Sequence, residues 1–190
     1  MALTMSTMLA LGTSAPHFEL TDVVSGKTVS PKTAANKALL VMFICKHCPY
    51  VKHIESELAK LGRDYSGKEI GIIAISSNDA EKHTDDSPEN LKKFAEAHAF
   101  AFPLCYDETQ EVAKSYTAAC TPDFFLFDKE HKLVYRGQLD ESRPGNDKPV
   151  TGKDLRAAVD AVLSGAKVDH DQKPSAGCNI KWKPGSEPKY

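Results

Sequence analysis

The chain passes from an apolar strand into a helix at Ala38-Leu-Leu-Val-Met-Phe-Ile-Cys45-Lys-His-Cys48-Pro49. The residues before Cys45 are continuously apolar and of strand length, which predicts a central strand covered on both faces. Beyond Pro49, apolar residues recur at helical spacing, at Val51, Ile54, Leu58 and Leu61. The pattern therefore predicts a helix that begins after the cysteine pair, with Gly62 as its expected end.

A second apolar run, Ile70-Gly-Ile-Ile-Ala-Ile75, follows this helix. Strand, helix and strand in that order predict a right-handed βαβ unit with parallel strands. Turn residues and spacing predict the other elements. These are a hairpin in residues 17–30, a helix capped by Ser87 and Pro88, a strand at 103–106, a helix at 111–116, a hairpin of 124–127 and 133–139, and a helix from Thr151, with Asp154 as its capping-box partner, to Gly165.

Two polar segments flank these elements. Residues 78–90 hold five acidic residues and a proline, which predicts a solvated loop. Residues 166–190 are rich in Lys, Pro and Gly and have the composition of a loose tail. Because that tail also contains Cys178, Ile180 and the single Trp182, we expect residues 178–182 to dock on the domain.

Length and charge narrow the class of protein. A chain of 190 residues fits a single domain over residues 1–190, with a core of about 12–165 and a tail of 166–190. The net charge of -2 argues against nucleic acid as a partner. No apolar run approaches the ~20 residues that cross a bilayer, and no Lys or Arg precedes Lys27, so we expect a cytoplasmic protein without a membrane partner.

The cysteine pair carries the chemistry that the sequence predicts. Cys45 and Cys48 lie where a strand meets a helix, and a helix N-terminus favours thiolate over thiol. We expect Cys45 to have the lowered pKa and to attack, Cys48 to be shielded and to resolve, and Lys46 and His47 to add positive charge. Two thiols that merely pack are a less favoured alternative, because a Cys-x-x-Cys beside a βαβ unit is typical of redox sites.

Metal binding is a second alternative for this cluster. Cys45, His47, Cys48 and His53 lie close together in sequence and include soft ligands. A closed zinc site usually takes four ligands in two separated pairs, and the sequence has no second Cys-x-x-Cys. We therefore expect no metal, and a zinc-binding or redox-sensing module stays the non-enzymatic alternative.

Several motifs together carry a resemblance to a known family. Cys45-Lys-His-Cys-Pro49, followed by Thr121-Pro122 and Phe124-Phe-Leu-Phe, resembles the thioredoxin superfamily, and Gly12-Thr-Ser-Ala-Pro-His-Phe resembles its peroxiredoxin and alkyl hydroperoxide reductase branch. Segments around Ser142-Arg-Pro-Gly, Val150-Thr-Gly and Pro174-Ser-Ala-Gly-Cys178 are similar to peroxiredoxin-like bacterial proteins. The resemblance implies an α/β thioredoxin fold: a central mixed sheet flanked by helices, an N-terminal β-hairpin, a strand-helix insertion before a cis-proline, and a docked C-terminal tail.

The resemblance also implies roles for single residues. Cys45 is the expected nucleophile and Cys48 the resolving thiol, while Pro122 is the expected cis-proline. A cis bond there would turn the Thr121 backbone toward a substrate peptide that adds as a strand. Such a thiol–disulfide oxidoreductase needs no cofactor beyond the Cys45–Cys48 disulfide, and its partners are protein or small-molecule disulfides and dithiols.

Departures from the family pattern bear on the reaction. Peroxiredoxins have Pro and Thr or Ser where this chain has Ala38 and Met42, so thiol peroxidase activity, with a Cys45 sulfenic acid resolved by Cys48 or Cys178, is the alternative function. The buried acid of thioredoxin is replaced by Leu39, so proton transfer must use another group. His47 before the second cysteine resembles protein disulfide isomerases and predicts a couple more oxidising than that of thioredoxin.

The other cysteines stand alone in the sequence. Cys120 precedes Thr121-Pro122 and is either a third redox partner or a core residue. A docked tail could bring Cys178 within disulfide range of Cys45, as the C-terminal resolving cysteine of some peroxiredoxins does, but a packing role for Cys178 is the favoured interpretation. Cys105 lies in a predicted strand and is expected to belong to the core.

Overall fold

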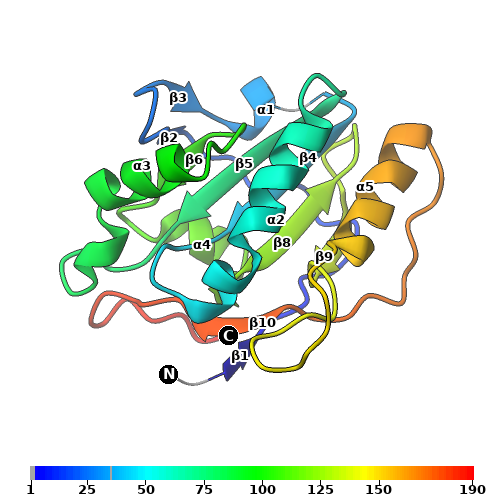
Figure 1. Cartoon of the computed structure of the whole chain (residues 1–190). Coiled ribbons are helices and arrows are strands. Elements are labelled where there is room, and N and C mark those ends of the chain that lie inside the picture. Colours follow the sequence, from blue (N-terminus) through cyan, green and yellow to red (C-terminus); the bar gives the residue numbers. More distant parts are fainter. Residues whose placement is uncertain (1–2, 35) are drawn as a thin grey trace.

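The computed structural model describes residues 3–34 and 36–190 (Figure 1). The helices and strands within these residues are β1 (Leu3–Met5), β2 (Leu20–Thr21), β3 (Thr28–Val29), α1 (Pro31–Ala34), β4 (Ala38–Phe43), α2 (Pro49–Tyr65), β5 (Ile70–Ser76), the 3-10 helix η1 (Thr84–Asp86), α3 (Pro88–Ala97), β6 (Leu104–Tyr106), α4 (Glu111–Ser115), β7 (Cys120–Thr121), β8 (Asp123–Phe127), β9 (Leu133–Gly137), α5 (Lys153–Ser164) and β10 (Ala176–Asn179).

A mixed sheet forms the centre of the domain. Within the described residues it has five strands in the order β6-β5-β4-β8-β9. β4 pairs parallel with β5 and antiparallel with β8, so the predicted βαβ unit and the predicted hairpin meet at this strand. The short pair β2 and β3 confirms the N-terminal hairpin, and β6 with α3 confirms the expected insertion before β7.

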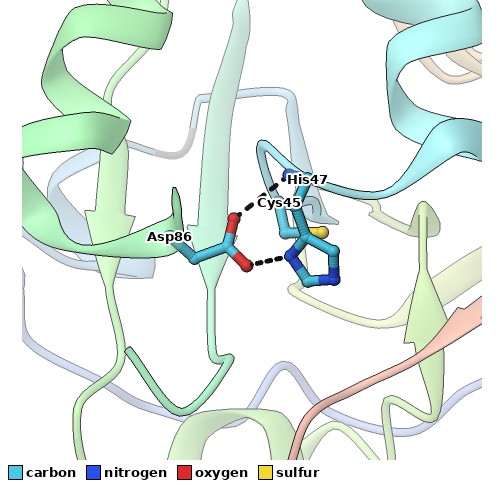
Figure 2. A group of neighbouring side chains, drawn as sticks. All are labelled: Cys45, His47 and Asp86. Atoms are coloured by element: carbon cyan, nitrogen blue, oxygen red, sulfur yellow. Dashed lines mark hydrogen bonds and ion pairs between the residues drawn. The ribbon is translucent and has the colours of Figure 1, made fainter. Parts of the chain in front are cut away.

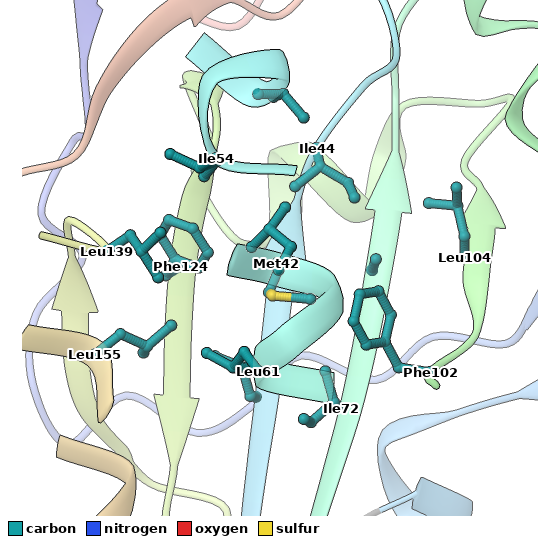
Figure 3. Packing of buried hydrophobic residues seen from close by; sticks show 14 of the residues in the cluster. Met42, Ile44, Ile54, Leu61, Ile72, Phe102, Leu104, Phe124, Leu139 and Leu155 are labelled. Atoms are coloured by element: carbon teal, nitrogen blue, oxygen red, sulfur yellow. The ribbon is translucent and has the colours of Figure 1, made fainter. Parts of the chain in front are cut away.

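The sheet buries an apolar layer on each face. Leu40, Met42 and Ile44 of one face pack in a cluster with residues of α2, α3 and α5, part of which Figure 3 shows. Leu39 and Val41 point to the other face, where α4 and the Tyr116 ring cover them. Figure 1 shows α2 and α5 on one side of the sheet and α4 behind it. This alternation follows from the two-residue period of a strand that is covered on both faces.

Helix α2 is longer than the sequence pattern predicts. It continues past Gly62 to Tyr65, so the expected end at Gly62 is wrong. A Cβ atom at Gly62 would lie 2.7 Å from Cδ1 of Phe102, which is closer than real contacts allow. Glycine is therefore required here by the close approach of the Phe102 ring and not by the end of a helix.

The helix termini differ in how well local sequence predicted them. Ser87 caps α3 by accepting a hydrogen bond from the Asn90 backbone N–H at 3.4 Å, as expected. The capping box at Thr151 is wrong, because Gly152 is the N-cap residue of α5, with a φ of 66° and no side-chain cap. The α5 C-cap is Gly165 in the left-handed conformation, which confirms the predicted end.

The C-terminal segment docks on the domain, as predicted. Strand β10 pairs antiparallel with β1 on one side and with β7 on the other. Cys178 and Ile180 are buried, and Trp182 packs against the apolar cluster beside α4. In Figure 1 the orange strand β10 runs beside β1, below the ends of β4 and α2.

The prediction that residues 78–90 form a solvated loop is wrong for its key residues. Asn78, Asp79 and Asp86 are all buried. Burying a polar side chain is costly unless hydrogen bonds satisfy it, and Asp86 finds its partners in the turn that holds the cysteines.

Among the described residues, none of the helices is both long and apolar enough to cross a bilayer.

Candidate active site

The cysteine pair occupies the turn between β4 and α2. Cys48 is the N-cap residue of α2, and both cysteines are almost fully buried, with 1% of Cys45 and 0% of Cys48 exposed. Thr121 lies against both sulfurs: its Oγ1 atom is 3.3 Å from Cys45 Sγ, and its carbonyl oxygen is 3.2 Å from Cys48 Sγ. The bond between Thr121 and Pro122 is cis, as the resemblance implied.

A third sulfur adjoins the pair. Cys178 Sγ lies 2.8 Å from Cys48 Sγ, although the two residues are 130 positions apart in sequence. The register of β10 places Cys178 opposite Thr121, and the cysteine that its sulfur contacts is Cys48, whereas the partner considered from the sequence is Cys45. The sulfur of Cys48 therefore contacts two other cysteines, Cys45 and Cys178.

Asp86 fixes the turn that holds the cysteines, and sequence reasoning missed it (Figure 2). Its Oδ1 atom accepts hydrogen bonds from the backbone N–H groups of Lys46, at 2.7 Å, and His47, at 3.3 Å. Its Oδ2 atom pairs with Nδ1 of His47 and accepts from Nδ2 of Asn78 at 2.8 Å. The signal that could have found Asp86 is topological, since the loops after parallel strands meet at one edge of a sheet.

His47 and Asp86 form a buried charged pair. Burial alone would raise the pKa of Asp86, but hydrogen bonds from His47 and Asn78 hold it below the usual value. The hydrogen bond to Asp86 raises the pKa of His47 above its usual value, against the opposing effect of burial. The His83 ring stacks on the His47 ring with 5.3 Å between centroids. The contact with Asp86 therefore favours the charged form of His47 and places a negative charge beside it.

The two cysteines have opposite pKa shifts. The hydrogen bond that Cys45 shares with Cys48, burial and the negative charge of Asp86 all raise the pKa of Cys45. Despite burial, the hydrogen bond with Cys45, a further one from Cys178 and the Val51 backbone N–H lower the pKa of Cys48. The expectation that Cys45 has the lowered pKa is wrong in this arrangement, because its hydrogen bond with Cys48, its burial and the Asp86 charge all act in the opposite direction to the helix N-terminus.

The remaining predicted residues are separated from the two sulfurs. Lys46 Nζ lies 3.8 Å from Asp85, so its charge is partly neutralised there. Nε2 of His53 lies 2.7 Å from Ser142 Oγ, and His53 is not part of the group of possible ligands that Cys45, His47 and Asp86 form. Cys120 Sγ points to the Pro122 carbonyl oxygen at 3.7 Å, and burial raises the pKa of Cys120, as it does for the core residue Cys105.

One group of side chains has the composition of a metal site. Ligand atoms of Cys45, His47 and Asp86 lie within 4.8 Å of one another. In this arrangement the Asp86 oxygens accept hydrogen bonds from two backbone N–H groups and from Asn78. The same contacts make Asp86 a structural acceptor for the turn, which is the use of this carboxylate that the geometry supports.

The edge of β7 is occupied. The resemblance implied that the Thr121 backbone receives a substrate peptide, but β10 of the chain itself pairs with β7 there. A Cβ atom on Gly177 would lie 1.9 Å from the Thr121 carbonyl oxygen, so the two strands approach as closely as glycine allows. In this arrangement the docked tail takes the position expected for the peptide.

Comparisons with known proteins agree with this geometry. Residues 11–136 match the AhpC/TSA family. The thiol-disulfide oxidoreductase ResA of Bacillus thuringiensis subsp. konkukian is 27% identical over 133 residues, which cover 66% of this chain and 68% of that protein. The thioredoxin domain of a thiol-disulfide oxidoreductase from Bacteroides vulgatus has 26% identity and a TM-score of 0.57, over 71% of this chain and 90% of that chain.

Two solved structures resemble this protein over nearly its whole length. An uncharacterized conserved protein from Geobacillus kaustophilus has 55% identity and a TM-score of 0.95, covering 97% of this chain and 98% of that chain. A hypothetical protein from Sinorhizobium meliloti 1021 has 49% identity and a TM-score of 0.93, covering 96% and 100%. The fold is the thioredoxin fold, and the family match spans more than half of the sequence. The chain therefore belongs to the AhpC/TSA family.

Proposed function

We propose that Cys45 and Cys48 are the working pair of this thiol–disulfide oxidoreductase. The observation that carries the proposal is the shared environment of the two sulfurs: both contact Thr121, and they share a hydrogen bond at the start of α2. A dithiol held in this way closes to a disulfide without moving the backbone far, which is what exchange chemistry requires. The ResA relative is named for the same activity.

The opposite pKa shifts suggest how Cys45 attacks. In the reduced site the negative charge resides on Cys48, which holds the Cys45 proton in a hydrogen bond. As Cys45 attacks a substrate disulfide, its proton passes to Cys48, one substrate sulfur leaves as a thiolate, and a mixed disulfide forms. Cys48 then loses that proton to the leaving thiolate and attacks Cys45, which leaves the enzyme oxidised and the substrate reduced.

Thioredoxin has a buried acid at the position that Leu39 occupies in this chain. We assign the role of that acid to His47 and Asp86. A ring nitrogen of His47 lies within 4.8 Å of Cys45 Sγ, and Asp86 holds the ring by its Nδ1 atom. We assign these residues to charge balance at Cys45: the imidazolium offsets the negative charge that develops there as the sulfur attacks. The family resemblance supports protein or small-molecule disulfides as substrates.

The experiment is a redox titration with thiol mapping. The full chain is equilibrated in graded glutathione buffers, alkylated, digested and analysed by peptide mass. We expect a Cys45–Cys48 disulfide peptide to appear at a midpoint between about -270 and -180 mV, the range from thioredoxin to protein disulfide isomerase. Absence of this peptide at every buffer ratio would contradict the proposal.

The order of attack has its own test. With a peptide disulfide as substrate, Cys48→Ser is expected to accumulate a mixed disulfide on Cys45. Cys105→Ser, which changes a core cysteine outside the site, is the matched control and should release the substrate normally. Absence of a mixed disulfide on Cys45 would contradict its assignment as the nucleophile.

The family match favours thiol peroxidase activity as a second candidate. In that reaction Cys45 becomes a sulfenic acid that a second thiol converts to a disulfide. Peroxiredoxins have a Thr or Ser hydroxyl at the position that Met42 occupies here. Met42 packs in the apolar core, and the site therefore lacks this hydroxyl. Treating the reduced protein with hydrogen peroxide and trapping the sulfenic acid with dimedone tests this candidate, and slow oxidation at the rate of free cysteine would exclude it.

A further inference from the structure

Strand β10 is held in register on both sides of Cys178. Before it, Ser175 Oγ donates to the Pro122 carbonyl oxygen at 2.6 Å. Beyond it, the backbone N–H of Lys181 donates to Asn78 Oδ1 at 2.8 Å, and the N–H of Asp79 donates to the Lys181 carbonyl oxygen at 2.8 Å. These bonds fix Cys178 relative to the cysteine pair, so its position does not depend on a loose tail.

Cys48 therefore has two neighbouring thiols. It shares a hydrogen bond with Cys45, and its sulfur lies 2.8 Å from that of Cys178, closer than the sum of two sulfur radii. Cys178 is 3% exposed, so the contact is sheltered from solvent. A disulfide bond of ~2.05 Å is reached from this separation by a small side-chain movement.

We propose that Cys178 is a third redox thiol that exchanges with the Cys45–Cys48 disulfide. Cys178 loses its proton and attacks Cys48 Sγ. The Cys48–Cys178 bond forms as the Cys45–Cys48 bond breaks, and Cys45 leaves with the electron pair and takes up a proton. One disulfide and one thiol are present before and after, so the step needs no further oxidant.

The exchange gives the oxidised protein a second form. In that form β10 is tied covalently to the start of α2, and Cys45 is a thiol again although the enzyme is still oxidised. Burial and the hydrogen bond with Cys48 raise the pKa of Cys178 to about 12, so Cys178 must lose its proton as it attacks. This inference rests on the proposed function, because it starts from the Cys45–Cys48 disulfide.

Disulfide mapping of the full chain tests the exchange. Wild type and the variants Cys45→Ser, Cys45→Ala, Cys48→Ser and Cys178→Ala are oxidised with glutathione disulfide, quenched in acid, alkylated and digested. We expect both Cys45–Cys48 and Cys48–Cys178 peptides from wild type. Both Cys45 variants should form Cys48–Cys178, and Cys48→Ser should lack this bond, since it removes the sulfur that lies 2.8 Å from that of Cys178.

Alkylation of the oxidised protein gives a second readout. Part of the oxidised wild type should have Cys45 alkylated, whereas Cys178→Ala should have none. Cys105→Ala, the matched control, should behave as wild type. If wild type forms Cys45–Cys48 but no preparation contains Cys48–Cys178, the exchange is wrong and the proposed function stands. If wild type forms no Cys45–Cys48 bond, the proposed function fails.

Discussion

The two sides of the cysteine pair are built from different parts of the chain and have opposite electrostatic effects. On the Cys45 side, the loop after β5 supplies Asp86, a carboxylate that binds the backbone of the turn. On the Cys48 side, the C-terminal strand supplies Cys178, a thiol whose sulfur lies in hydrogen-bond contact with that of Cys48. The pKa of Cys45 is raised and that of Cys48 is lowered, so helix position alone does not decide the direction of either shift.

Removing the carboxylate on the Cys45 side is expected to have the largest effect. In Asp86→Ala, the partly buried His47 side chain, the buried Asn78 side chain and two backbone N–H groups lose their acceptor. Loss of one partner from a buried pair costs about 3–5 kcal/mol in the free energy of unfolding. Urea unfolding of wild type and variant measures this loss.

Asp85→Ala is the control for that experiment. Asp85 is the neighbouring residue, and its ion pair with Lys46 lies at the surface. Surface pairs contribute about 0–1 kcal/mol. Equal losses of stability in the two variants would show that the buried carboxylate does not fix the turn.

Disturbing the Cys48 side should expose the pair. In Gly177→Ala, the new Cβ atom overlaps the Thr121 carbonyl oxygen, so β10 must move away from β7. Overpacking of this kind costs about 1–3 kcal/mol in the stability of the β10–β7 contact. If iodoacetamide reaches Cys48 only when β10 opens, the alkylation rate of Cys48 should rise about 5- to 150-fold.

The matched variant for this test is Gly185→Ala, in the same C-terminal segment. A Cβ atom on Gly185 meets open space, although its φ of +77° makes the substitution strained. We expect little change in the alkylation of Cys48. A similar increase in both variants would mean that general loosening of the tail, and not the contact between β10 and β7, controls access.

The charged pair on the Cys45 side predicts a pH dependence of stability. Because the pKa of His47 is raised in the folded protein, its contribution is complete below its unfolded pKa and is lost as pH rises through the folded value. The pKa of Asp86 is lowered in the folded protein, so its contribution to stability has the opposite pH dependence. That contribution is lost as pH falls through the folded pKa of Asp86. The difference in unfolding free energy between wild type and His47→Gln should therefore shrink from about pH 6 upward. Urea unfolding across this range measures it, and a constant difference would contradict the charged pair.

The smallest expected effect concerns the hydroxyl that contacts Cys45. Thr121→Val removes one hydrogen bond to Cys45 Sγ and keeps the backbone carbonyl beside Cys48. A hydrogen bond contributes about 1 kcal/mol, so the second-order rate of disulfide reduction should fall about fivefold. Thr121→Ser keeps the hydroxyl and should restore most of the rate. Equal rates of disulfide reduction by Thr121→Val and Thr121→Ser would exclude a role for this hydroxyl.

Local patterns predicted the elements better than they predicted the site. Apolar runs and turn residues located β4, α2, β5 and the β8–β9 hairpin, because strand and helix periodicities depend on neighbouring residues. Gly62 was misread as a helix end because its role depends on Phe102, a contact made only in the folded chain. The capping box at Thr151 failed because Gly152 takes the N-cap position in the left-handed conformation.

The site depends on contacts between residues far apart in sequence. The Cys-x-x-Cys motif and the cis-proline could be predicted from motif and resemblance. Asp86 is 39 residues from His47, and Cys178 is 130 residues from Cys48, so neither contact has a local sequence signal. Knowing that a tail docks did not reveal its register, and the register of β10 decides which sulfur Cys178 contacts.

The most direct test is to titrate each cysteine of the reduced protein by NMR. Protein labelled with ¹³C at cysteine Cβ is titrated over pH, with resonances assigned from single Cys→Ala variants. We predict that the Cys48 resonance shifts at a pH below the usual thiol pKa, whereas the Cys45 resonance shifts above it. A Cys45 resonance that shifts first, while that of Cys48 keeps the thiol position, would contradict the assigned division of charge.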